Sequence, residues 1–159
     1  MIRMKIFYFL LLSLLLSMQA YAKESSISEE DSLATYVEKF VRYQQDGDVD
    51  KAIYYGCKVK DIWDRNNWEK DSLYCNLVYT LSGLHESIGE YDKSGSLLKP
   101  LLPIIREIYG ENSIEEASIV NSLALSQSYL GNYSEAIRLE NEYMDLYSIY
   151  NILYKTIRL

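Results

Sequence analysis

The side chains that could carry out chemistry are few in this chain, and they are not grouped. Its 159 residues contain one histidine, His85, and the residues that would share its helical face offer no second metal ligand. The carboxylate pairs Glu29-Glu30 and Glu115-Glu116 are adjacent in sequence, so a helix would point their members in different directions and favour them as helix-start charges. Neither a glycine-rich phosphate loop nor a Gly-x-Ser-x-Gly motif occurs. We therefore expect no enzymatic activity, no metal site and no cofactor.

Two cysteines, Cys57 and Cys75, lie on either side of an expected chain reversal near Asn67. The two arms from the reversal to the cysteines differ by two residues, which is about 3 Å of helix rise and is compatible with a disulfide. Two buried apolar thiols are the alternative. The sequence leaves both open, and the lack of a Cys-x-x-Cys motif speaks against a redox catalyst.

The first 22 residues have the pattern of a secretory signal. A basic start, Met-Ile-Arg-Met-Lys, precedes an apolar run from Ile6 to Met18 and the small-residue site Ala20-Tyr21-Ala22. The run is shorter than the roughly 20 residues that a membrane-spanning helix needs. We expect residues 1–22 to be a signal peptide that is cleaved and exports the chain to a bacterial periplasm or medium, with an uncleaved anchor as the alternative. Residues 23–31 are rich in acidic residues and serine and are predicted to be a disordered leader.

The charge balance of the chain disfavours two classes of binding partner. The chain has 16 basic and 23 acidic side chains and a formal net charge of −7, and cleavage would remove two of the basic ones, Arg3 and Lys5. Nucleic acids and anionic lipid surfaces require a basic footprint. We therefore expect no nucleic acid partner and no membrane contact beyond the signal peptide.

Three glycines recur at intervals of 42 residues, and each opens a similar phrase: Gly47-Asp-Val-Asp-Lys-Ala52, Gly89-Glu-Tyr-Asp-Lys-Ser94 and Gly131-Asn-Tyr-Ser-Glu-Ala136. Such regularity indicates an internal repeat of supersecondary units. Apolar residues at helical spacing predict helices over residues 32–46, 49–64, 71–88, 91–109, 114–130 and 133–150. Pro100 and Pro103 predict a bend in the fourth of them.

These helices are expected to form an all-α solenoid of stacked antiparallel pairs, because each pair alone would expose a large apolar face. The domain is predicted to span residues 32–159, with units at about 32–70, 71–112 and 113–150. Apolar residues near the end of the chain would stay uncovered and predict self-association or further repeats there: Ile149, Ile152, Leu153, Tyr154, Ile157 and Leu159.

The repeated phrase resembles the tetratricopeptide repeat, in which Gly-x-Tyr-x-x-Ala follows a Leu-Ala pair. The third unit matches most fully, with Leu123-Ala124, Gly131, Tyr133 and Ala136; the second reads Leu81-Ser82, Gly89, Tyr91 and Ser94. The first unit departs from the pattern and resembles an atypical capping repeat. The 42-residue period resembles the longer-helix variety found in kinesin light chains.

This resemblance implies a concave groove, lined by the first helix of each unit, that takes a peptide. The positions carried over from the family are Asn76, Tyr79, Gly83 and Glu86 in the second unit, and Asn121, Leu125, Ser128 and Tyr129 in the third. Asn121 is the leading candidate, because an amide side chain can donate to a peptide carbonyl and accept from a peptide N–H.

We therefore expect an exported, non-enzymatic adaptor or scaffold that binds a protein or peptide partner. One alternative is the N-terminal sensor or regulatory region of a larger exported signalling or catalytic protein. A glycan-directed enzyme that uses the aromatic groove is a third possibility, suggested by the 16 tyrosines. The identity of the partner does not follow from the sequence.

Overall fold

The computed structural model describes the backbone of residues 32–157 and the side chains of residues 32–152. The predicted signal peptide and acidic leader, residues 1–22 and 23–31, lie outside the described residues. Over this range the backbone forms helices and no strand, which confirms the predicted all-α class. The helices are residues 32–46, α2 (Val49–Arg65), α3 (Ser72–Ser87), α4 (Tyr91–Tyr109), α5 (Ile114–Tyr129) and α6 (Tyr133–Ile157).

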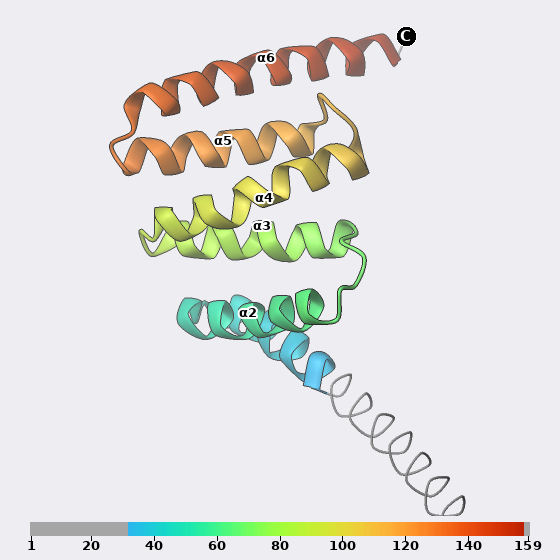
Figure 1. Cartoon of the computed structure of the whole chain (residues 1–159), viewed down its shortest axis with the longest axis vertical. Coiled ribbons are helices and arrows are strands. Elements are labelled where there is room, and N and C mark those ends of the chain that lie inside the picture. The colour runs from blue at the N-terminus through green and yellow to red at the C-terminus, as the bar shows by residue number, and fades with distance from the viewer. Residues whose placement is uncertain (1–31, 158–159) are drawn as a thin grey trace, which may run out of the picture.

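Each helix packs against its neighbours in chain order, α2 on α3, α3 on α4, α4 on α5 and α5 on α6. Figure 1 shows the resulting elongated stack, with α6 at one end and the helix of residues 32–46 beside α2 at the other. This arrangement confirms the predicted solenoid of antiparallel helix pairs. None of the described helices is both long and apolar enough to cross a membrane.

The three repeated glycines make the same turn in each unit. Gly47, Gly89 and Gly131 have φ angles of 73°, 79° and 78°, in the left-handed region where glycine is favoured. In each turn the amide of the following residue reaches back 2.9 Å to a carbonyl in the last turn of the helix: Asp48 to Tyr43, Glu90 to His85 and Asn132 to Gln127. This is the Schellman geometry of a helix end, and it sets the antiparallel pairing of the two helices in each unit.

Small residues allow these helices to approach closely. Ser82 and Ser94 in the second unit are buried, as are Ala124 and Ala136 in the third, which agrees with the packing expected for the repeat. Gly56 on α2 plays a similar part outside the repeated phrase. A Cβ added there would meet Leu81 and Phe40 atoms at 2.7 Å.

The last helix is longer than predicted, whereas the fourth has the predicted bounds. α6 continues to Ile157, so its predicted end at Tyr150 is wrong; no glycine or proline follows Tyr150 to stop it. α4 contains Pro100 and Pro103 yet runs without interruption from Tyr91 to Tyr109, and Figure 1 shows it crossing the stack obliquely.

Both cysteines are free thiols. Cys75 is buried in the main core cluster, whereas Cys57 is half-buried beside the core of the first unit. Burial is the main cause that raises the pKa of each thiol, with nearby carboxylates adding to it. The sequence left a disulfide and two buried thiols as alternatives; the structure contains free thiols, of which Cys75 is buried.

Candidate functional site: the exposed face of the first helices

The first helices of the three units present a common exposed face, here called the first-helix face. At two positions of the 42-residue register it carries Val37, Tyr79 and Asn121, and Val41, Gly83 and Leu125, all of which are exposed. Val37 and Val41 retain 40% and 44% exposure although they are large apolar residues. Their place on this face follows from the 42-residue register of Tyr79 and Gly83.

A hollow of about 160 Å³ opens on this face between α3 and α5. Asn76 and Tyr79, two of the predicted groove residues, line it from α3. The remaining lining residues were not predicted: Cys75 from α3, Glu115, Ser118 and Ile119 from α5, and Ile105 and Tyr109 from the end of α4. Its walls therefore combine apolar side chains with an amide, a phenol, a hydroxyl and a carboxylate.

The amide groups of Asn76 and Asn121 are available to a ligand. Both residues are exposed, and no other described residue gives either amide a hydrogen-bond partner. An unpaired amide in water can exchange its solvent hydrogen bonds for bonds to the N–H and C=O of an extended peptide. Both asparagine side chains are therefore able to bind a peptide backbone.

The other predicted groove residues are in part engaged within the protein. Glu86 is half-buried, and its carboxylate accepts a 2.7 Å hydrogen bond from Ser94 on α4. Tyr129 stacks on Tyr91, with the ring centroids 4.1 Å apart and the planes within 1°. Desolvation and a hydrogen bond with Tyr129 raise the pKa of Tyr91. Leu125 and Ser128 are exposed on α5, so this end of the face offers apolar and aromatic surface.

His85, the single histidine, is buried and lies 2.7 Å from Glu90 through its Nδ1 atom. His85 lies in the last turn of α3, and Glu90 is the residue that precedes α4. Among the described residues no group of three or more histidine, cysteine, aspartate or glutamate side chains could hold a metal ion.

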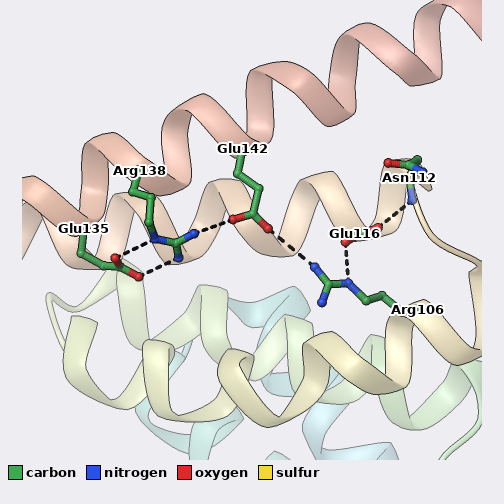
Figure 2. Close-up of polar contacts among 6 residues, drawn as sticks. All are labelled: Arg106, Asn112, Glu116, Glu135, Arg138 and Glu142. Carbon is green, nitrogen blue, oxygen red and sulfur yellow. Dashed lines mark hydrogen bonds and ion pairs between the residues drawn. The ribbon is translucent and has the colours of Figure 1, made fainter.

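A network of ion pairs fixes α5 and α6 relative to α4, as Figure 2 shows. Arg106 on α4 reaches Glu116 at 2.6 Å and Glu142 at 3.6 Å, and Arg138 pairs with both Glu142 and Glu135. Glu116 also accepts a 2.7 Å hydrogen bond from the backbone of Asn112. Glu116 does lie in the first turn of α5, as a helix-start charge should, but it is only 3% exposed. Its main partner is thus a side chain from the preceding helix.

Residues 73–148 match the sequence profile of the tetratricopeptide repeat. This region belongs to the tetratricopeptide repeat family. Its 42-residue register and its Schellman turns at Gly89 and Gly131 fall inside the matched region. Among curated protein sequences, none is significantly similar to it.

Solved structures of low sequence identity share the fold. One contains nearly identical TPR-like repeats from a protein assigned as a kinesin light chain in Podosopora anserina, with 18% identity, a TM-score of 0.59, and coverage of 73% of this chain and 55% of that one. A single-substitution variant of the same repeats gives 18% identity and a TM-score of 0.59 over 80% and 57% of the two chains. BtubC (BKLC) from P. vanneervenii is 13% identical in sequence, with a TM-score of 0.51 and coverage of 75% of this chain and 64% of that one.

The likeness to kinesin light chain repeats agrees with the predicted long-repeat variety, and at these identities it establishes the fold. The chain spans between 55% and 64% of the length of these three structures.

Proposed function

We propose that this tetratricopeptide repeat protein is a non-enzymatic adaptor that binds an extended segment of a protein partner on its first-helix face. The supporting observation is the hollow between α3 and α5, which combines apolar walls with the unpaired amide of Asn76. Asn121 and the exposed Val37, Val41 and Leu125 continue this surface to either side. Amides bind the peptide backbone, and apolar side chains select the residues that alternate along it.

Peptide display against residues 23–159 tests this proposal without a known partner. Selected peptides are titrated into the isotope-labelled chain, and the backbone amide signals that shift are mapped. We expect the largest shifts at Asn76, Tyr79, Asn121 and Leu125. Shifts confined to α2 and α6, or a library that yields no binder, would contradict the proposal.

We further propose that the chain is exported, as its first 22 residues suggest. In a bacterial host the full-length chain should be recovered outside the cytoplasm with Lys23 as its N-terminal residue. Retention in the cytoplasm with Met1 or Ile2 first would contradict export.

An exposed apolar face on α6 favours a second role, that of one part of a larger assembly. Tyr133, Ile137, Met144 and Ile152 are between 59% and 67% exposed. Surfaces of this kind mark contacts with another protein or with further repeats. If the face mediates self-association, sedimentation should show a dimer. The variant Ile137→Lys/Met144→Lys should then be a monomer. A monomer of the unmodified chain at all concentrations would contradict self-association and leave further repeats as the expected neighbour of this face.

A further inference from the structure

Two tyrosine rings lie face to face where α4 begins and α5 ends, and they are here called the tyrosine pair. Tyr91 is the first residue of α4 and Tyr129 is the last residue of α5. The two helices pack side by side in opposite directions, so these ends meet (Figure 1). The ring centroids are 4.1 Å apart and the ring planes differ by 1°. The turns at Gly89 and Gly131 fix the backbone beside each ring.

The surroundings of the tyrosine pair are negatively charged. Desolvation is the main cause that raises the pKa of Tyr91, and the Tyr129 hydroxyl and the negative charge of Glu86 raise it further. Tyr91 thus has a second phenol and a carboxylate as neighbours. A negative charge nearby stabilises the positive charge that a ring gains when it loses an electron.

A second stacked pair in the chain lacks both advantages. The rings of Tyr43 and Tyr55 are parallel within 7°, but their centroids are 5.5 Å apart. The ammonium groups of Lys51 and Lys39 lie 5.0 Å from the centroids of the Tyr43 and Tyr55 rings, respectively. A cation over a ring opposes the removal of an electron from that ring. Oxidation should therefore favour the tyrosine pair over this one.

We propose that the tyrosine pair is a site of oxidative cross-linking, at which a peroxidase and hydrogen peroxide join Tyr91 to Tyr129 as dityrosine. The peroxidase takes one electron from each phenol, and each hydroxyl proton goes to water, which leaves two neutral phenoxyl radicals. A carbon–carbon bond then forms between one ring carbon of each tyrosine, next to the carbon that bears the oxygen. The hydrogens on those two carbons move through water to the oxygens and restore both hydroxyls. The two electrons and two protons removed reduce one hydrogen peroxide to two waters.

The geometry favours coupling within one chain over coupling between chains. Two phenoxyl radicals must meet before they couple, and rings that are already in contact need no diffusion. Tyr129 is 63% exposed, so an oxidant in solution can reach it, and Tyr91 lies against it. The exposed ring is also able to tilt as the bond forms. The product is a covalent link between the second unit and the third.

The test treats the purified chain, at low micromolar concentration, with a haem peroxidase and one equivalent of hydrogen peroxide. Dityrosine fluorescence gives the rate, and mass spectrometry of the digested monomer identifies the residues that are joined. We expect a monomer that has lost two hydrogen atoms, in which the main cross-link joins the peptides of Tyr91 and Tyr129. A monomer without this link, or cross-links found mainly between chains or at other tyrosines, would overturn the proposal.

Single substitutions by phenylalanine separate this site from general tyrosine oxidation. Tyr91→Phe and Tyr129→Phe each keep a ring in the stack but remove one phenol, so each should lower the initial rate of dityrosine formation by about fivefold or more. Tyr43→Phe is the matched control, because it removes one phenol from the more widely spaced stack. It should retain most of the rate. Equal losses in all three variants would contradict a preferred site.

The cross-link should also stabilise the stack, because it closes a loop that contains α4 and α5 and so lowers the entropy of the unfolded chain. The cross-linked monomer should melt about 5 °C or more above the untreated chain. Tyr91→Phe after the same treatment should show no such rise. A melting temperature that does not rise, or that rises equally in Tyr91→Phe, would contradict a link between the two helices. Because no partner takes part, the result is independent of the adaptor function.

Discussion

At the scale of single residues, close packing between paired helices determines which substitutions this protein tolerates. Ala124 on α5 and Ala136 on α6 are buried in the third unit, and Leu123 beside them is 4% exposed. Leu125, two residues further along the same helix, is 42% exposed. Two leucines on one helix thus have opposite environments, one in the core and one on the first-helix face.

Leu123→Ala should lower the free energy of unfolding by roughly 2–5 kcal/mol, because it removes buried methyl groups and leaves a cavity. Leu125→Ala is its matched control and should change stability by less than about 0.5 kcal/mol. Urea denaturation of both variants measures the difference. Equal midpoints would contradict the packing of α5.

Two helical glycines should respond in opposite ways to substitution by alanine. A Cβ at Gly56 would meet Leu81 and Phe40 at 2.7 Å, whereas a Cβ at Gly83 meets nothing within 4 Å. Both lie inside helices, where alanine is favoured over glycine. We expect Gly83→Ala to raise the melting temperature and Gly56→Ala to be less stable than it by about 1–3 kcal/mol. A higher melting temperature for Gly56→Ala than for Gly83→Ala would show that this contact is loose.

The cysteines respond to pH in a defined direction. Because burial raises the pKa of both thiols, the reactive thiolate forms only at a higher pH than for an exposed cysteine. Alkylation by iodoacetamide should therefore be slow at neutral pH, accelerate as the pH rises, and modify the half-buried Cys57 before Cys75. Rapid labelling of Cys75 at neutral pH, read by mass spectrometry, would contradict its burial.

At the scale of helices, the network around Arg106 determines how α4, α5 and α6 hold together. Glu116 is 3% exposed, and Arg106 is the cation that neutralises it. Arg138 pairs with Glu135 and Glu142 at the surface, with 58% of its own side chain exposed. The same kind of ion pair thus occurs in one buried and one solvated setting.

Arg106→Met should lower the free energy of unfolding by about 3 kcal/mol, because it leaves a buried carboxylate without its cation. Arg138→Met removes two exposed pairs and should cost at most about 1 kcal/mol. Chemical denaturation at equal ionic strength compares them. Costs of similar size would contradict the buried character of the Arg106–Glu116 pair.

Helix ends could be predicted from the sequence where a local signal marks them. The glycine turns at Gly47, Gly89 and Gly131 were found because a left-handed residue and a fixed period both mark them. The end of α6 was missed because no glycine or proline marks it. Ile105 and Tyr109, which line the hollow, were missed because they come from a second helix and reach the first-helix face only through tertiary packing.

At the scale of the whole molecule, the stack separates two surfaces. The first-helix face carries unpaired amides and exposed apolar residues, and α6 carries a separate exposed apolar face. Because each helix contacts mainly its neighbours in chain order, these surfaces can change with little effect on the rest of the stack. That separation makes substitutions on one face a clean test of function.

Binding of a display-selected peptide to the Asn121→Ala/Leu125→Ala variant tests the adaptor function most directly. Both residues are exposed on α5, and the matched control is Asn141→Ala/Tyr147→Ala, whose two residues are exposed on α6. We predict an affinity at least about tenfold lower for the α5 variant, with unchanged melting temperatures, and wild-type affinity for the α6 variant. Wild-type affinity in the α5 variant, or an equal loss in both, would contradict binding on the first-helix face.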